Sequence, residues 1–295
     1  MKVSMSTVGA QWVKENGEKR YDPAQGVRDC AAAGFRYLDF DLSSAAKNGG
    51  PMSREDFPVW CREMRRVLDE CGVTVEQTHG HWCWPSVMPT QEERDRNWQM
   101  TLRSVEAASY LGNRPWMVTH PISVFDAEGY NREKSVELGY RQYSELGELG
   151  KKYGTRIAAE HLFVIADKNG YCCGVEDLLE LMEKLDDPEL FGICWDFGHA
   201  NRQGVDQAAG LRMAAPYLRA THVHDNNAKS DNHVFPYCGN IPWAELLPIL
   251  GEIGYSGTLN LEVHVLQQRL PASLRMETLR YLHTVVTDMA AQTGI

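Results

Sequence analysis

Short apolar runs alternate along the chain with longer segments whose apolar residues recur at helical spacing. The first kind of run predicts buried strands, and the second predicts helices that pack on them. Four predicted helices end at a glycine directly before a strand, as short helix-to-strand loops require: Gly34, Gly72, Gly154 and Gly254. The predicted strands are Val3–Thr7, Phe35–Phe40, Val73–Gln77, Trp116–Thr119, Arg156–Ala159, Phe191–Trp195, Leu218–Val223 and Thr258–Val263. The predicted helices are Gly26–Ala33, Phe57–Cys71, Arg94–Tyr110, Glu133–Tyr153, Val175–Lys184, Val205–Ala214, Trp243–Ile253 and Leu274–Ala291.

The strand and helix units repeat eight times over the 295 residues. Strict alternation implies parallel strands with helices outside them. Eight such units predict an α/β fold, a single (β/α)8 TIM barrel domain over residues 1–295. The competing doubly wound sheet usually has a glycine-rich phosphate loop after its first strand, and the sequence contains neither GxGxxG nor GxxxxGK[ST].

Composition narrows the class of protein further. The chain is 43% hydrophobic, enough for a large core, yet no run reaches the ~18 apolar residues of a membrane span. The first residues, MKVSMSTVGA, have no apolar signal core, so we expect a cytoplasmic protein. The 8 cysteines form no CxxC pair, which favours reduced thiols. A formal net charge of -10 disfavours binding to nucleic acid or anionic lipid.

The histidines are the most unusual feature of the chain. A TIM barrel places its chemistry at the carboxyl ends of the strands, and of the 10 histidines only His283 lies away from the predicted strand ends. The others are His79, His81, His120, His161, His199, His222, His224, His233 and His264. This distribution predicts one histidine-rich site at the mouth of the barrel, by which we mean the opening at the carboxyl ends of the strands.

Four side chains on successive strands predict a metal site in this mouth. Glu160, Asp196, His222 and Glu262 stand at the same relative position of four strands. Three carboxylates and one imidazole form a mostly oxygen ligand set, which suits Mn²⁺, Mg²⁺ or Co²⁺ and also accommodates Zn²⁺. Without a cation, the carboxylates would repel each other and take up protons.

The remaining mouth residues admit several roles. His79, His120, His199, Asp231 and His233 could each be a further metal ligand, a substrate contact or a structural residue. His161, His224 and His264 are expected to support the ligands from behind. Aromatic residues near the same strand ends could wall a sugar-sized pocket or belong to the core: Trp82, Trp84 and Trp195.

These strand-end motifs resemble the xylose isomerase-like TIM-barrel superfamily. It includes sugar phosphate isomerases and epimerases, isomerases and dehydratases of inositol catabolism, and endonuclease IV. The resemblance covers nearly the whole chain and rests on AAEHL (158–162), CWDFGHAN (194–201), THVHDNN (221–227), SDNHVFPYCGNIPW (230–243) and LNLEVH (259–264). It implies a divalent metal and a small sugar or polyol substrate, and a homo-oligomer is possible because many relatives are dimers or tetramers. The charge and composition given above, not the resemblance, argue against nucleic acid or a membrane as a partner.

The resemblance also assigns roles by position. It implies that Glu160, Asp196, His222 and Glu262 are the metal ligands. His222 is preferred over His224, two residues on, because it keeps Asp225 in register with the family's motif. His199 matches a histidine that binds substrate or a second metal. Endonuclease IV-like members hold three metals, and the extra ligands would fall at His79, His120, His199, Asp231 and His233.

The resulting hypothesis is a metal-dependent sugar isomerase or epimerase that works by proton transfer through a metal-stabilised enediolate. Glu160 and Glu262 would exchange the proton, and His199 would orient a substrate oxygen. The alternatives are a metal-dependent dehydratase or lyase, and an endonuclease IV-like multi-metal hydrolase. DNA binding would need basic loops around the mouth, whereas the loop cations Lys47, Arg54, Lys168, Arg202, Lys229 and Arg269 are scattered. The Gly-Glu-x-Asn-Arg pattern of ketose 3-epimerases is absent, and the sequence shows no anchor for a phosphate.

Overall fold

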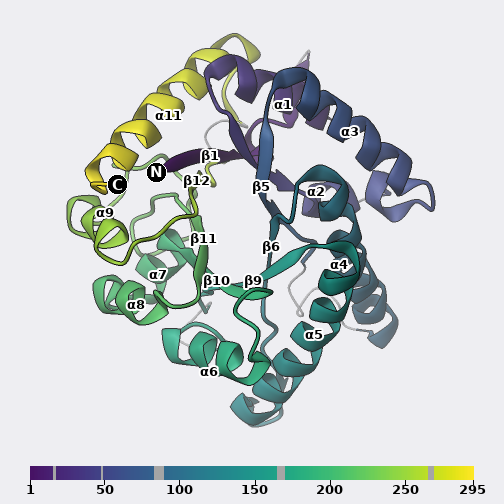
Figure 1. Ribbon diagram of the computed structural model, residues 1–295, viewed down its shortest axis with the longest axis vertical. Coiled ribbons are helices and arrows are strands. Elements are labelled where there is room, and N and C mark those ends of the chain that lie inside the picture. Colours follow the sequence, from purple (N-terminus) through teal and green to yellow (C-terminus); the bar gives the residue numbers. More distant parts are fainter. Residues whose placement is uncertain (16–17, 48, 83–89, 165–169, 265–268) are drawn as a thin grey trace.

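Eight parallel strands form the centre of the molecule, and helices surround them (Figure 1). The computed structural model describes residues 1–15, 18–47, 49–82, 90–164, 170–264 and 269–295. Around the sheet the strands are β11 (Leu218–His222), β10 (Phe191–Asp196), β9 (Arg156–Glu160), β6 (Trp116–Thr119), β5 (Thr74–His79), β4 (Tyr37–Asp41), β1 (Lys2–Ser6) and β12 (Thr258–Leu261). All eight predicted strands are confirmed, and no end shifts by more than two residues.

The two ends of this sheet meet each other. The amide of Val223, directly after β11, donates to the carbonyl of Asn260 on β12 at 2.7 Å. The amide of Glu262 donates in return to the carbonyl of Val223 at 3.0 Å. The sheet therefore closes into a (β/α)8 barrel, and the doubly wound alternative is wrong.

The eight predicted helices are also confirmed. They are α1 (Pro23–Ala33), α3 (Phe57–Cys71), α4 (Gln91–Leu111), α5 (Arg132–Tyr153), α6 (Val175–Leu185), α8 (Gln207–Ala214), α9 (Trp243–Glu252) and α11 (Ala272–Gln292). Local chemistry fixes their ends: Thr90 and Glu93 form a capping box at the start of α4, and Gly34 ends α1 with φ of 116°. α11 completes the ring, so the amino group of Met1 donates to the carbonyl of Ile295 at 2.9 Å.

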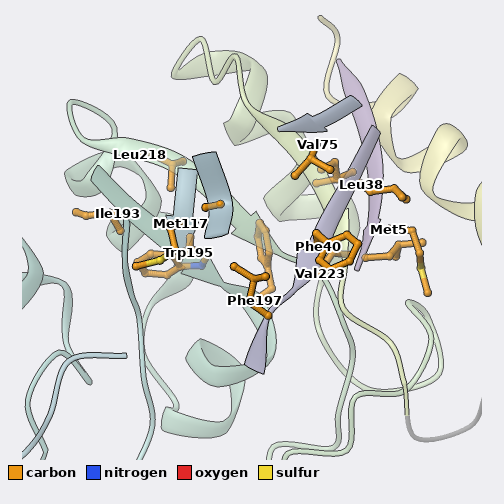
Figure 2. Close-up of a cluster of buried hydrophobic side chains, with 14 of the residues drawn as sticks. Met5, Leu38, Phe40, Val75, Met117, Ile193, Trp195, Phe197, Leu218 and Val223 are labelled. Atoms are coloured by element: carbon orange, nitrogen blue, oxygen red, sulfur yellow. The ribbon is translucent and has the colours of Figure 1, made fainter. Parts of the chain in front are cut away.

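Apolar side chains fill two separate regions. The larger lies between the strands and the helices, and Figure 2 shows part of it, including Met5, Phe40 and Trp195. The smaller comprises Trp116, Val118, Ala158, Cys194 and Ala220 and lies apart from the first. Because side chains alternate along a strand, Trp195 points outward while its neighbours Cys194 and Asp196 point into the barrel. The suggestion that Trp195 walls a sugar pocket is therefore wrong.

The hydrophobic pattern of the sequence did not predict several short elements. A hairpin of β2 (Trp12–Glu15) and β3 (Glu18–Tyr21) follows the first strand after the 3-10 turn η1 (Thr7–Gly9). Its alternation is mostly polar, so no apolar run marks it. The others are α2 (Ser43–Ala46), the 3-10 turn η2 (Pro51–Ser53), the β7–β8 pair (Phe125–Asp126 with Gly129–Tyr130) and α7 (Phe197–Gln203).

Two predictions from composition can be compared with the described residues. None of their helices is both long and apolar enough to cross a membrane. The seven cysteines among them are free thiols, five of them buried. The eighth, Cys83, lies outside the described residues, as does Trp84.

Candidate metal centre

The four side chains predicted to bind a metal meet inside the mouth of the barrel. We call Glu160, Asp196, His222 and Glu262 the central group; one donor atom from each lies within 4.8 Å of the others. Nδ1 of His222 faces three carboxylate oxygens at once, at 3.0 Å from Glu160, 3.4 Å from Glu262 and 3.5 Å from Asp196. One nitrogen can donate at most one proton along one direction. Four donor atoms that converge in this way fit a divalent cation.

The strands explain why these four side chains converge. Glu160, Asp196 and His222 are the last residues of β9, β10 and β11, and Glu262 directly follows β12. Each is two residues beyond an inward-facing neighbour on its own strand, so each also points into the barrel. The geometry of the central group is therefore set by the register of the sheet, in which Asp196 pairs with His222.

Burial and charge act against each other in the central group. Burial alone would raise the pKa of Glu160, but the charges of His120 and His222 outweigh it and hold that pKa well below its usual range. Burial raises the pKa of Glu262. For His222, burial disfavours the charged form, but Cys194 and the surrounding carboxylates together lift its pKa well above the usual value. Buried carboxylates that depend on a neighbouring positive charge are what a cation-binding site requires.

Asp39 lies behind His222 and was missed in the sequence. Its Oδ2 is 3.5 Å from Nε2 of His222, on the side of the ring away from the central group. The same oxygen accepts hydrogen bonds from Asn260 at 3.0 Å and Gln77 at 3.1 Å. Nε2 of His222 has no hydrogen-bond partner among the described residues, so its contact with Asp39 is electrostatic. A carboxylate on the far side of a metal-binding histidine is a common orienting partner. The only sequence signal was an acidic residue inside a strand that otherwise reads as apolar.

His79 and His120 both contact Glu160 of the central group. Nε2 of His120 is 2.8 Å from Oε2 of Glu160, and Nε2 of His79 is 3.3 Å from the same oxygen. Burial lowers the pKa of His120 to about 4, while Glu160 outweighs burial at His79 and raises its pKa to about 9. His79, Glu160 and His222 form a second set of converging donors.

A third set of donors lies nearer the edge of the mouth. We call His199, His224, Asp231 and His233 the rim group. Nε2 of His233 is 2.8 Å from Asp231 Oδ2, and Nε2 of His199 is 3.7 Å from that oxygen. Nε2 of His224 is 3.7 Å from Asp231 Oδ1 and 3.1 Å from Asp196 Oδ1. Asp196 thus touches both groups. His222 belongs to the central group, and His224 belongs to the rim group. His224 was expected to support the ligands from behind, but it stands among the converging donors instead.

Three of these histidines share one pattern of hydrogen bonds. Nδ1 lies 2.9 Å from the carbonyl of Gly80 in His79, 2.9 Å from that of His161 in His199, and 2.8 Å from that of Glu262 in His233. A carbonyl only accepts, so Nδ1 must donate. Nε2 is then the atom directed at the carboxylates. This tautomer is the one that a metal ligand needs.

The rim group depends on a loop that Asp225 holds in place. The buried carboxylate of Asp225 accepts hydrogen bonds from the amides of Asn226, Tyr237 and Ile241 and from the indole of Trp243. Its backbone pairs with Val234 in both directions, at 2.9 and 3.1 Å. Within this loop His233 has φ of 44°, a strained conformation for a residue with a side chain. Asp225 is therefore a structural residue of the loop.

His161 and His264, which were expected to support the ligands, pack beside the donor groups. The ring of His161 packs against Trp195 at 4.8 Å, and both of its nitrogens lack a hydrogen-bond partner among the described residues. Burial lowers its pKa to about 4. His264 packs against His233 at 4.3 Å. Neither ring contributes to any of the three donor sets found among the described residues.

The comparison with known protein families agrees with this fold. The family model described as xylose isomerase-like TIM barrel matches residues 27–282. The chain belongs to this family. The uncharacterized protein MJ1311 of Methanocaldococcus jannaschii is 30% identical over 148 residues, so the match spans 50% of this chain and 50% of that protein.

Solved structures of the xylose isomerase-like fold cover the whole chain. D-Psicose 3-epimerase from Clostridium cellulolyticum H10, solved with D-tagatose, has a TM-score of 0.73 at 16% identity and covers 99% of each chain. The IOLI protein with a bound zinc atom has a TM-score of 0.71 at 15% identity, again over 99% of each chain. At these identities the likeness establishes the fold.

Proposed function

We propose that this protein is a divalent-metal-dependent isomerase or epimerase of a small sugar or polyol derivative. One observation supports it above all: Nδ1 of His222 lies within 3.5 Å of three carboxylate oxygens that reach it from three other strands. A bound cation, with Mn²⁺, Mg²⁺ or Co²⁺ preferred and Zn²⁺ compatible, would polarise a substrate carbonyl and stabilise negative charge on the adjacent oxygens. The fold is shared with sugar epimerases.

The chain's own residues would move the proton. Glu160 ends β9 and Glu262 directly follows β12. Both carboxylates lie close to the same atom, Nδ1 of His222. One carboxylate removes the proton from the carbon next to the carbonyl, and the other returns a proton on the opposite face or at the neighbouring carbon. His199, whose Nδ1 donates to a backbone carbonyl, presents Nε2 to a substrate oxygen.

Proton exchange tests this proposal even when the product is unidentified. Metal-loaded protein is incubated in D₂O with a panel of ketoses, and NMR detects deuterium at the carbon next to the carbonyl. We expect exchange with at least one ketose, and its loss in Glu262→Gln but not in the exposed control Glu183→Gln. Exchange that survives in both Glu160→Gln and Glu262→Gln would refute the proton-transfer scheme.

The three donor sets favour a second candidate, a multi-metal hydrolase. His79, His120, Asp231, His233 and His199 approach the carboxylates closely enough to hold further ions beside the central one. Two or three ions could activate a water and clamp a phosphate. The number of metals per chain, measured by mass spectrometry, separates the candidates: one supports the isomerase, and two or three support the hydrolase. The scattered loop cations and the charge of -10 argue against DNA as its substrate.

A further inference from the structure

Two cations at the mouth, Lys47 and Arg202, are placed in the same way. Nζ of Lys47 lies 5.1 Å from the ring centre of Trp82, and the guanidinium of Arg202 lies 5.6 Å from that of Phe163. Trp82 in turn stacks on His120 at 4.3 Å, and Phe163 packs on His199 at 4.9 Å. Each cation is thus held by an aromatic ring that rests on a histidine of the candidate metal centre.

The two histidines beneath these aromatic rings, His120 and His199, both contact the carboxylate of Glu160. His120 and His199 lie edge to face with ring centres 6.4 Å apart. Both contact Glu160, at 2.8 Å from Nε2 of His120 and 3.4 Å from Nδ1 of His199. A molecule bound at the central group would therefore have a cation within reach on either side of this pair.

Neither cation is neutralised by the part of the chain that the structure describes. No carboxylate among those residues lies within ion-pair distance of Lys47 or Arg202. Nε of Arg202 is buried and has no hydrogen-bond partner there. A buried donor without a partner is uncommon and costs free energy unless a ligand satisfies it. In a chain with 40 acidic and 30 basic side chains, two cations at one opening with no carboxylate partner among the described residues are unexpected.

The position of Arg202 on its helix supports a role in binding. Arg202 and His199 are three residues apart on α7, so both side chains lie on the same face of that helix. Asp196, a member of the central group, caps the same helix by accepting from the amide of His199 at 2.7 Å. The helix therefore fixes Arg202 relative to the centre.

We propose that the substrate is an anionic sugar derivative whose phosphate or carboxylate group, remote from the reacting carbonyl, is bound by Arg202 and Lys47. This inference rests on the proposed function, since it assumes a ligand at the central group. Arg202 is the stronger contact because its Nε has no partner among the described residues, and Lys47, which is exposed, adds a weaker attraction that salt screens. A neutral ketose would leave both cations without a counter-charge from the described residues.

Calorimetric titration of Mn²⁺-loaded protein tests this with three probes of one carbon skeleton. They are D-fructose, D-fructose 6-phosphate and D-fructuronate, each titrated at low and at high salt. We expect at least one anionic sugar to bind about tenfold or more tightly than D-fructose. Preference for the phosphate alone or for the carboxylate alone identifies the source of the charge. Equal affinity for all three, or no binding of either anion, overturns the inference.

Substitutions of Arg202 and Lys47 show which residue gives the preference for an anionic sugar. Arg202→Gln should remove most of the preference for the anion and leave affinity for D-fructose within about twofold, and Lys47→Gln should remove a smaller, salt-sensitive part. Arg62→Gln is the matched control, because Arg62 lies 5.8 Å from the ring of Tyr110 on the outer helices. An anion preference that survives in both mouth variants overturns the assignment of these residues.

Binding and turnover separate this inference from the proposed function. Preference for an anion without any deuterium exchange would support the inference and refute the isomerase. Exchange with D-fructose, together with equal binding of the three sugars, would support the isomerase and refute the inference.

Discussion

The central group and the rim group use similar side chains on very different supports. The central residues end three strands of a closed sheet or directly follow a fourth, so the barrel itself fixes their positions. In the rim group, Asp231 and His233 belong to an irregular loop, and His233 has φ of 44°. Their burial differs too: the side chain of His222 is fully buried, whereas that of Asp231 is 22% exposed. A ligand set built on strands should bind tightly and carry the chemistry, whereas one built on a loop should bind more weakly.

The largest predicted effect comes from the central group. Glu160→Gln removes a charge that His222, His120 and His79 all contact, and it removes one of the two proton-transfer groups. We expect proton exchange to fall by about 10³-fold, within the range of general acid–base catalysis. Asp231→Asn, in the rim group, should lower exchange by less than about tenfold. A larger loss in Asp231→Asn than in Glu160→Gln would reverse the roles of the two groups.

Removal of metal should also distinguish the central group from the rim group. A cation that binds only the folded chain stabilises it by about 2.7 kcal/mol when the free ion is at a hundredfold its Kd. Chelation should therefore lower the melting temperature by several degrees, which differential scanning calorimetry would detect. If the rim group holds an ion, a weak chelator should remove it first. A melting temperature that is the same with and without chelator would contradict the metal assignment.

Asp225→Asn should damage the rim group selectively. The substitution replaces one carboxylate oxygen of a buried hub by an amide nitrogen, which cannot accept from the amides and the indole that now donate to Asp225. Loss of one such bond in a buried site costs about 1–3 kcal/mol. We expect lower stability by urea denaturation and weaker metal binding at the rim, with the affinity of the central site unchanged. Equal weakening of both sites would show that the loop also supports the strand ends.

The comparison also explains what the sequence could and could not predict. The strands could be predicted because apolar runs and glycine stops mark them. The central group could be predicted because each of its residues stands at the same place relative to its strand. α7 was read as part of a loop, since Phe197–Gln203 is only a short helix whose start depends on the carboxylate of Asp196. Asp39 was missed because its partners, Asn260 and Gln77, come from distant parts of the chain. Contacts across the barrel interior leave no periodic signal.

The smallest predicted effect concerns the contact between His222 of the central group and Asp39 in the barrel interior. Asp39→Asn keeps the shape of the side chain but places an amide where Nε2 of His222 and two amide donors now face a carboxylate. Orienting partners of metal-binding histidines typically contribute 10–100-fold to affinity. Because Asp39 is 3.5 Å from His222, we expect the lower end, a loss of about tenfold in metal affinity by calorimetric titration. At saturating metal, proton exchange should recover to nearly the original rate, as it should if Asp39 only positions His222. Exchange that stays low at saturating metal would instead place Asp39 among the residues that act on the substrate.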